Sequence, residues 1–379
     1  MTPHHRDLDF LDGMRGLAAL YVLVGHARWL LWEGFGSYSQ HSQSYHLLGK
    51  LVVYASALAR FGHEAVIFFF VLSGFVIHLR YARLLLRDPH APFDLFPYLS
   101  RRARRLYPPL IAALAITYGL DRLGQSADLP TATGTTLYPL INEHVRFDHS
   151  AVTLTRNLAF VTDPVFGSDG PLWSLGYEWY FYLLYPLVFG LARRSWKAAT
   201  IAMTLTSALG FLPVWGQHLD WPRHIFQMML IWWFGATLAD SFIGRPGISL
   251  QALRWLMPCL GAVFVKQVDP FLRDIVIGLG FAGLLAGLLD LKRRGWRLSP
   301  LVKLKPLGEF SYSLYVIHFP ILVLLSGWLM KTSAGRLPAH FGWAVCGVFG
   351  SLAVAWGLHL VVERPFVRHR SGNSVVRTS

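Results

Sequence analysis

Ten apolar runs of about 20 residues dominate this chain and constrain its fold more than any other feature. The runs lie near residues 14–33, 64–83, 106–121, 172–192, 198–215, 223–242, 251–268, 272–290, 311–330 and 341–362. A helix needs about 20 mostly apolar residues to cross a bilayer, and continuous rather than alternating runs argue against a β-barrel. The sequence therefore predicts an all-α, polytopic membrane bundle of about ten transmembrane helices, with nine or eleven also compatible.

The composition agrees with a membrane protein and excludes other classes. Of the 379 residues, 54% are hydrophobic and 15% are charged, whereas a soluble globular protein carries about 25% charged residues. Intrinsic disorder needs low hydrophobicity. The two cysteines, Cys259 and Cys346, lie inside apolar runs and are too few for a disulfide scaffold. We expect one transmembrane domain over residues 1–370 and a polar, disordered tail over residues 371–379.

The 35 Lys and Arg residues indicate how the spans are oriented. They exceed the 21 Asp and Glu residues by 14, and cytoplasmic loops carry such an excess in membrane proteins. When both termini are placed in the cytoplasm, 23 of the 35 basic residues fall on inside segments, ten on the opposite side, and Arg15 and Arg28 within the first span. The sequence therefore predicts cytoplasmic termini, no cleavable signal peptide, and basic loops that meet anionic lipids or an anionic cytosolic ligand. Nucleic acid is not an expected partner.

The first span carries two ionisable residues, which are costly in a bilayer and are therefore functional candidates. Arg15 and His26 are eleven residues apart, close to three helical turns, so both side chains project from one face. Asp12 precedes Arg15 by three residues and is expected to pair with it. Two alternatives stay open: Arg15 is an anchor that reaches the cytoplasmic surface, and His26 makes a hydrogen bond between helices.

Glu178 in the fourth span is expected at a depth similar to that of His26. The two residues lie about 9 and 10 Å below the outer ends of their helices. A carboxylate beside an imidazole orients the ring and raises its basicity, which suits a general base. The alternative is a structural hydrogen bond from Glu178 to a neighbouring Tyr or Trp. The same segment contains the secondary candidates Trp173 and Ser174, and its aromatic residues are candidate oxyanion donors.

Polar residues in two other spans are further secondary candidates. Ser73 lies beside Gly74 in the second span, where two small residues suit close helix packing. Ser73 is also a candidate nucleophile, although no base is adjacent in sequence. Tyr312 and His318 lie in the ninth span, and His318 is expected near mid-membrane.

Arg102 and Arg105 lie three residues apart before the third span and share one helical face. Two guanidinium groups suit a phosphate-bearing ligand at the membrane surface; the alternatives are a topology signal and binding of anionic lipid. The third span itself is expected to start at Pro108-Pro109, because proline suits a helix N-terminus. No metal site is expected, since paired-cysteine and His-Glu-x-x-His patterns are absent.

Five sequence blocks occur in a recognisable order along the chain. They are LDFLDGMRGLAALYVLVGH, FFFVLSGFVI, RRARRLYPP, GPLWSLGYEWYFYLLYP and FSYSLYVIHFP, and an ERPF ending follows them. Together these blocks resemble the acyltransferase 3 family of integral-membrane O-acyltransferases. The resemblance covers nearly the whole chain.

The resemblance implies transfer of an acyl group, commonly acetyl from acetyl-CoA, to a hydroxyl. Acceptors in the family are sugars of surface polysaccharide, lipopolysaccharide, lipid-linked glycans or glycosylated small molecules. Arg15 and His26 match the family's Arg-x10-His pair, Glu178 matches its W-S-L-x-x-E glutamate, and Arg102 and Arg105 match its Arg-x-x-Arg, which is implicated with the CoA donor.

The resemblance also implies the setting of the reaction. It implies acyl-CoA as a co-substrate, no tightly bound cofactor, membrane lipids as partners and a bacterial inner (plasma) membrane location. Some family members carry an extra span and an SGNH-hydrolase-like domain, which we do not expect here. The oligomeric state is not predictable from the sequence.

Two other function classes are compatible with intramembrane charges. A transporter or flippase for a glycolipid or saccharide would use Arg, His and Glu as relay or substrate groups. Such transporters often contain internal repeats, and none is evident here. A non-catalytic membrane scaffold would leave the deep His26 and Glu178 unexplained.

Overall fold

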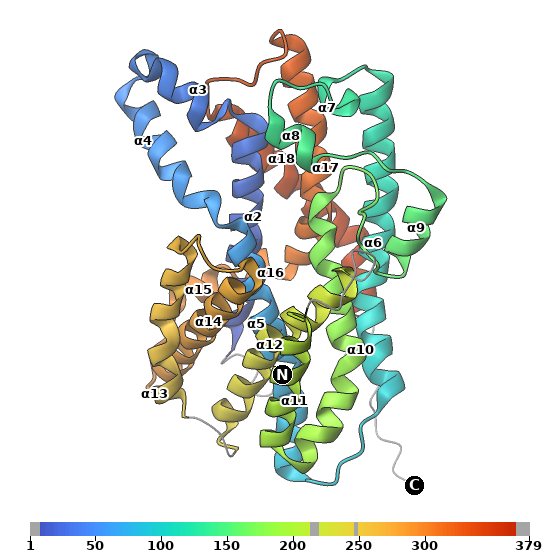
Figure 1. The fold of residues 1–379 in the computed structure, drawn as a ribbon, viewed down its shortest axis with the longest axis vertical. Helices are drawn as coiled ribbons and strands as arrows, with labels where there is room; N and C mark the ends of the chain where they lie inside the picture. Colours follow the sequence, from blue (N-terminus) through green and yellow to red (C-terminus); the bar gives the residue numbers. More distant parts are fainter. Residues whose placement is uncertain (1–7, 213–219, 246–248, 369–379) are drawn as a thin grey trace. The chain divides into compact units, whose positions relative to one another are not determined.

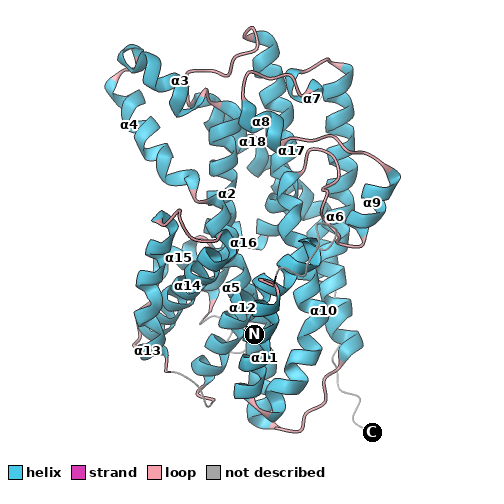
Figure 2. Ribbon diagram, in the orientation of Figure 1, coloured by secondary structure: helices cyan, strands magenta, loops and turns pink. Residues whose placement is uncertain are grey.

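The computed structural model describes residues 8–212, 220–245 and 249–368, and every regular element in these ranges is a helix (Figure 2). The predicted tail, residues 371–379, lies outside the described residues. The chain divides into two interleaved compact units. The first unit comprises residues 1–18, 63–95 and 176–307, and the second comprises residues 19–62, 96–175 and 308–379. One helix, α2 (Asp9–Leu31), contributes residues to both.

The first unit is built around long helices from the middle of the chain (Figure 1). Its elements after the start of α2 are α5 (Gly62–Arg87), α10 (Trp173–Arg194), α11 (Trp196–Leu209), α12 (Asp220–Ile243), α13 (Leu250–Leu253), η5 (Arg254–Phe264), α14 (Pro270–Arg293), α15 (Ser299–Lys303) and α16 (Lys305–Glu309). Helix α12 packs against α11 and α14, and η5 packs along α14.

Two glycines bring the backbones of α5 and α12 into direct contact in the first unit. A Cβ atom on Gly74 would lie 1.9 Å from the carbonyl oxygen of Trp232, and one on Gly235 would lie 1.9 Å from that of Val71. Neither position can therefore hold a side chain without moving a helix. The predicted close packing at the Ser73-Gly74 notch is confirmed.

The second unit contains the outer part of α2, the short helices that follow it, and the C-terminal helices. Its other elements are α3 (Gly34–His41), η1 (Ser42–Ser44), α4 (Leu47–Ser56), η2 (Ala57–Arg60), α6 (Leu95–Ser126), α7 (Pro130–Thr133), α8 (Pro139–His144), α9 (Ala151–Leu158), η3 (Gly170–Leu172), α17 (Ser311–Thr332), α18 (Gly342–Leu358), η6 (His359–Glu363) and α19 (Arg364–Arg368). Helices α17 and α18 pack side by side.

Helix α6 corrects one prediction about the third span. The helix does not start at Pro108-Pro109; it begins at Leu95 and continues through both prolines to Ser126. An interior proline lacks the N–H that would bond the carbonyl four residues earlier, and its ring crowds that carbonyl. In α6 the two adjacent prolines interrupt the hydrogen-bond ladder without ending the helix. Arg102 and Arg105 consequently lie within the helix, one to two turns before the prolines.

Five helical segments within the described residues are long and apolar enough to cross a membrane. They are Gly62–Arg87, Trp221–Ile243, Pro270–Arg293, Ser311–Thr332 and Gly342–Phe366. The other predicted spans coincide with α2, α6 and α10, which are long, and with α11 and Leu250–Phe264, which are shorter. The all-helical membrane fold is confirmed, while ten spans and cytoplasmic termini stay predictions.

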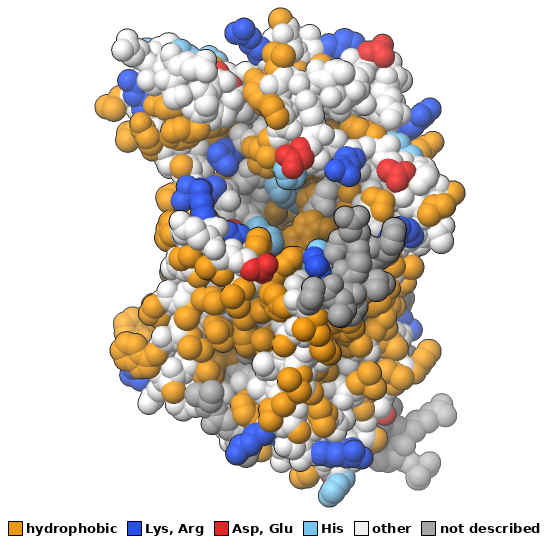
Figure 3. Space-filling model, viewed as in Figure 1, with side chains coloured by type: hydrophobic (Ala, Val, Ile, Leu, Met, Phe, Trp, Pro, Cys, Tyr) orange, Lys and Arg blue, Asp and Glu red, His pale blue; other side chains and the backbone are white. Residues whose placement is uncertain are grey.

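Large hydrophobic side chains are exposed on the helices of the first unit (Figure 3). Ile201 and Leu205 of α11 are each 59% exposed, and Trp255 of η5 is 73% exposed. Exposed apolar area of this kind is unfavourable in water and is expected where lipid is the solvent.

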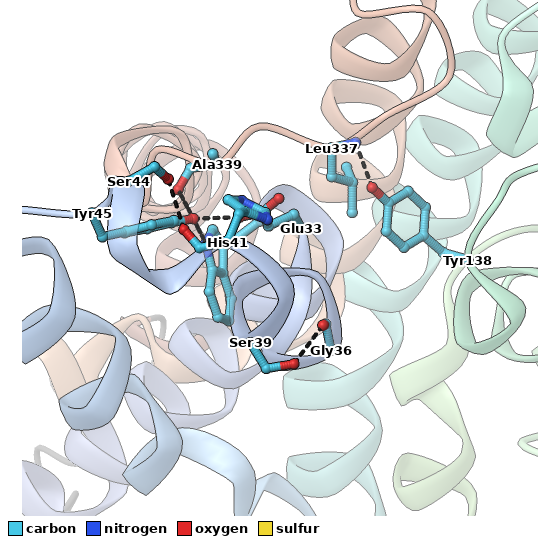
Figure 4. Close-up of polar contacts among 10 residues, drawn as sticks. Glu33, Gly36, Ser39, His41, Ser44, Tyr45, Tyr138, Leu337 and Ala339 are labelled. Carbon is cyan, nitrogen blue, oxygen red and sulfur yellow. Dashed lines mark hydrogen bonds and ion pairs between the residues drawn. The ribbon is translucent and has the colours of Figure 1, made fainter.

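A polar cluster in the second unit fastens the segment after α2 to the loop after α17 (Figure 4). The Tyr45 hydroxyl lies within hydrogen-bond distance of Glu33 and 2.7 Å from the Ala339 carbonyl oxygen. His41 lies 3.0 Å from Glu33, and the backbone N–H of Glu33 donates to Pro338. Burial and the hydrogen bond with Glu33 raise the pKa of Tyr45 to about 12. The cluster fixes the chain just beyond the end of α2.

Candidate functional site

His26 and His318 form a hydrogen-bonded pair inside the second unit. Nδ1 of His26, on α2, lies 2.8 Å from Nε2 of His318, on α17, and the two rings are nearly parallel, with an angle of 11° between them. His318 is 1% exposed, whereas His26 is only partly buried. Nδ1 of His318 lies 2.9 and 3.0 Å from the carbonyl oxygens of Leu314 and Tyr315. The structure thus brings together two predicted site residues that are 292 positions apart.

Aromatic side chains hold the His26 ring on its other sides. The Phe319 ring packs edge-to-face against it, with centroids 5.0 Å apart, and Trp29 lies at 6.2 Å. One side of the histidine pair therefore lies against the aromatic rings of Phe319 and Trp29.

The start of α10 and its preceding loop lie beside α17 in the same unit. The hydroxyl oxygens of Ser174 and Tyr315 are 2.6 Å apart, and the Tyr315 hydroxyl lies 3.1 Å from the Pro171 carbonyl oxygen. Ser174 is therefore hydrogen-bonded to Tyr315, which lies on α17 one turn before His318. Trp173 accepts a hydrogen bond from Thr162 through its backbone carbonyl, and its role as an oxyanion donor stays a prediction.

Glu178 lies in a different polar network, inside the first unit. Its Oε1 atom accepts hydrogen bonds from the Ser73 hydroxyl at 3.1 Å and from the Tyr182 hydroxyl. The indole N–H of Trp232 donates to the Ser73 hydroxyl at 3.3 Å. The alternative of a structural hydrogen bond between Glu178 and a neighbouring Tyr is thus present, and Ser73 has a carboxylate beside it that sequence spacing did not indicate.

The pairing of His26 with Glu178 stays a prediction, because His26 belongs to the second unit and Glu178 to the first. Helix α2 is continuous from Asp9 to Leu31, so it carries both Arg15 and His26 as expected. The Arg15 guanidinium lies 3.0 Å from the Asp12 carboxylate. The predicted ion pair is therefore confirmed.

The two arginines before the prolines lie on α6 of the second unit. The Arg102 guanidinium lies over the Tyr98 ring, 5.3 Å from its centroid, an arrangement that favours a cation. The Tyr312 hydroxyl donates to the backbone carbonyl of Leu106 at 2.9 Å and so ties α17 to α6 one residue beyond Arg105. Tyr312 therefore holds the helix that presents the arginines.

A second buried histidine, His78, was not singled out from the sequence. Its two ring nitrogens lie 2.9 Å from the Tyr185 hydroxyl and 3.1 Å from the Asp240 carboxylate. The other oxygen of Asp240 lies 3.1 Å from the Arg245 guanidinium. His78 and Asp240 could have been found in the sequence as ionisable residues inside apolar runs. Their contact, across 162 residues, could not be predicted from the sequence.

Two further carboxyl groups are buried in the second unit. Glu363, in the π-helical turn η6, accepts a hydrogen bond from Ser313 at 2.6 Å and lies 3.0 Å from Nδ1 of His359. Asp169, in the loop before η3, is fully buried, and neither carboxylate oxygen has a hydrogen-bond partner among the described residues. Burial, and then the nearby Asp121 carboxylate, raise the pKa of Asp169 well above its usual range.

Residues 8–360 match the model of a protein family described as "Acyltransferase domain". The chain is 24% identical over 85% of its length to "Putative peptidoglycan O-acetyltransferase YrhL" of Bacillus subtilis, and it spans about half of that relative, 50% of its length. It is 26% identical to "Acyltransferase MdmB" of Streptomyces mycarofaciens, over 97% of this chain and 94% of the relative. It is 23% identical to "Nodulation protein 10" of Rhizobium leguminosarum, over 97% and 95%. No solved structure matches the chain.

Proposed function

Because this chain belongs to the acyltransferase 3 family and is therefore an acyl-transferring enzyme of the membrane, we propose that it moves an acyl group, most simply acetyl, from acyl-CoA to a sugar hydroxyl. The acceptor would be a cell-surface polysaccharide, a lipid-linked glycan or a glycosylated small molecule. The enzyme would act in the bacterial inner membrane. The name of the Bacillus relative, "Putative peptidoglycan O-acetyltransferase YrhL", supports a carbohydrate acceptor.

The observation that carries this proposal is the His26–His318 pair. Acyl transfer to a hydroxyl needs a base that removes the hydroxyl proton as the oxygen attacks the acyl carbonyl. An imidazole serves this role at neutral pH, and the second unit places one on α2, hydrogen-bonded to a second imidazole on α17. We assign His26 as this base; a direct acyl-carrying role for its ring is the alternative.

Arg102 and Arg105 are assigned to the donor. Guanidinium groups pair with phosphates through parallel hydrogen bonds, and CoA carries several phosphate groups. Arg15, at the start of the same helix as His26, would lie along the path of the donor, while Asp12 holds its guanidinium in place. Glu178 accepts hydrogen bonds from Ser73 and Tyr182, and we assign it the role of positioning these two side chains.

The proposal is tested with membranes from cells that do or do not produce the protein. Radiolabelled acetyl-CoA is supplied, and label in the glycan fraction is followed, while mass spectrometry of the glycans gives the acceptor and the acyl group together. We expect protein-dependent label and a matching mass increase in a glycan. Unlabelled, unmodified glycans, with protein-dependent movement of a glycolipid across the membrane, would instead indicate a flippase.

A further inference from the structure

The hydrogen-bond partners of His318 determine where its protons lie. Its Nδ1 atom faces two backbone carbonyl oxygens, those of Leu314 at 2.9 Å and Tyr315 at 3.0 Å. A carbonyl oxygen only accepts hydrogen bonds, so Nδ1 of His318 must carry the hydrogen. In a neutral imidazole the second nitrogen is then an acceptor, and in His318 that nitrogen is Nε2.

The neutral form of this ring agrees with its surroundings. His318 is 1% exposed, and among the described residues its ring nitrogens contact two carbonyl oxygens and the ring of His26. A buried positive charge needs an opposite charge or several acceptors to offset the loss of hydration. Within the described residues of the second unit, no carboxylate contacts either ring of the pair.

The protons of His26 follow from those of His318. Because Nε2 of His318 accepts, the 2.8 Å hydrogen bond between the rings must be donated by Nδ1–H of His26. The remaining nitrogen of His26, Nε2, has no hydrogen-bond partner among the residues that the structure describes, and its lone pair is then free. We infer that His318 is a positioning residue that holds His26 in the Nδ1–H tautomer and thereby makes Nε2 of His26 the reactive nitrogen.

This inference rests on the proposed function and specifies its proton transfers. Nε2 of His26 takes the proton of the acceptor hydroxyl while the oxygen forms a bond to the thioester carbonyl carbon. The carbon–sulfur bond then breaks, and Nε2–H returns the proton to the departing CoA thiolate. Meanwhile Nδ1–H keeps its hydrogen bond to His318, which stabilises the positive charge that the His26 ring carries between the two steps.

The packing around His26 also restrains its ring from flipping. Phe319 follows His318 on α17 and packs edge-to-face on His26, with an angle of 84° between the rings. A flip of the His26 ring would move Nδ1 away from His318 and break the inter-ring hydrogen bond. The same short segment of α17 therefore sets both the orientation and the tautomer of His26.

The tautomer is measured directly by nitrogen NMR of ¹⁵N-histidine-labelled full-length protein in lipid bilayers. The signals of His26 are identified as those lost in His26→Gln. We expect Nδ1 of His26 to be protonated and Nε2 to be unprotonated at neutral pH. A protonated Nε2 in the wild-type protein would overturn the inference.

Two substitutions of His318 separate the acceptor role from simple packing. His318→Gln keeps a side-chain oxygen that can accept from Nδ1–H of His26, whereas His318→Leu removes every acceptor. We expect His318→Gln to keep the wild-type tautomer and His318→Leu to give a mixture with protonated Nε2. His359→Gln, a change of another buried histidine in the same unit, is the matched control and should leave the His26 signals in place.

Acetyl transfer gives a second readout. We expect His318→Leu to lower kcat at least about tenfold with the KM for acetyl-CoA changed less than about twofold, and His318→Gln to recover part of the loss. An unchanged tautomer and kcat in His318→Leu would contradict the positioning role. The NMR signals need no acyl transfer, so a protein that shows the expected tautomer but no transfer would refute the proposed function and leave this inference standing.

Discussion

Two histidines, the buried His78 in the first unit and the partly buried His26 in the second, differ in how many of their ring nitrogens have a hydrogen-bond partner. His78 in the first unit has a partner on both ring nitrogens, and its acidic partner Asp240 also pairs with Arg245. Among the described residues, His26 in the second unit has a hydrogen-bond partner on Nδ1 and none on Nε2, and the Nδ1 partner is a second imidazole. A histidine whose two ring nitrogens both have partners in a charge network stabilises the fold. A histidine with one ring nitrogen left without a partner can take part in proton transfer.

The largest effect is expected when the open histidine is removed. His26→Ala should lower acyl transfer about 10²–10⁴-fold, the usual contribution of a general base. The protein should still insert and keep its thermal stability, because His26 takes part in no ion pair with any residue that the structure describes. Radiolabelled acetyl transfer in membranes and the melting temperature in detergent measure both parts. Transfer at the wild-type rate would remove His26 from the mechanism.

A substitution in the His78–Asp240–Arg245 network should instead lower stability more than it lowers acyl transfer. Asp240→Ala leaves the buried His78 and the half-buried Arg245 without their carboxylate, and the loss of one partner from a buried pair costs about 3–5 kcal/mol. We expect a large fall in the free energy of unfolding, measured by denaturant titration, and a smaller fall in Asp240→Asn, which keeps a hydrogen-bond acceptor. Equal stability of Asp240→Ala and His26→Ala would erase the distinction between the two histidines.

Asp169 extends the comparison to a buried acid that has no cationic partner in the described part of the chain. Its pKa in the folded protein is raised, first by burial and then by Asp121, so the folded state holds this proton more tightly than the unfolded state. Stability from this group is therefore present below the unfolded pKa of about 3.9 and is lost as the pH rises toward the folded value. Asp169→Asn should be about 1–3 kcal/mol more stable than wild type at pH 8, an advantage that shrinks on acidification.

Asp148, in the loop before α9, provides the matched control for that pH dependence. Hydrogen bonds from Thr153, and then from Ser150, lower its pKa, so its stabilisation is present at neutral pH and is lost as the pH falls through the folded pKa. Asp148→Asn should therefore reduce stability at pH 8, opposite in sign to Asp169→Asn. Melting temperatures from pH 4 to pH 8 would test both, and the same sign for the two variants would contradict the assignment.

The smallest effect is expected at the donor arginines. Arg102→Ala and Arg105→Ala should each raise the KM for acetyl-CoA about tenfold, or about 1.4 kcal/mol, with little change in kcat, because they bind the donor without touching the reacting atoms. Steady-state kinetics in bilayers would show the split. An unchanged KM for the donor would indicate that these arginines serve as a topology signal or bind anionic lipid. The comparison of the two histidines would not be affected.

Local features of this site were predictable, and long-range ones were not. Spacing alone predicted the Asp12–Arg15 pair, because residues three apart meet on a helix. The four-residue spacing of Glu178 and Tyr182 likewise allows their contact. By contrast, the contacts of His26 with His318 and of Ser73 with Glu178 join residues 292 and 105 positions apart. Such contacts depend on which helix faces which, and periodicity does not specify that.

The spans show the same limit. Hydropathy located the apolar helices because a bilayer imposes length and apolarity on each segment separately. The preference of proline for helix N-termini placed the start of the third span at Pro108-Pro109, and its apolar run begins near residue 106, whereas α6 already begins at Leu95. The amphipathic, arginine-bearing turns before the prolines form helix without being apolar, and a hydropathy scan cannot include them.

The backbone contact between α5 and α12 bears on how mutational scans of this protein should be interpreted. Gly74 and Gly235 each face a carbonyl oxygen at a distance that excludes even a methyl group. In a saturation library selected for activity, these two positions should tolerate as few residues as His26, although neither takes part in the proposed chemistry. Intolerance to substitution at these positions of α5 and α12 would thus reflect helix packing. An assay that measures protein abundance separately from catalytic turnover would distinguish a packing defect from a catalytic one.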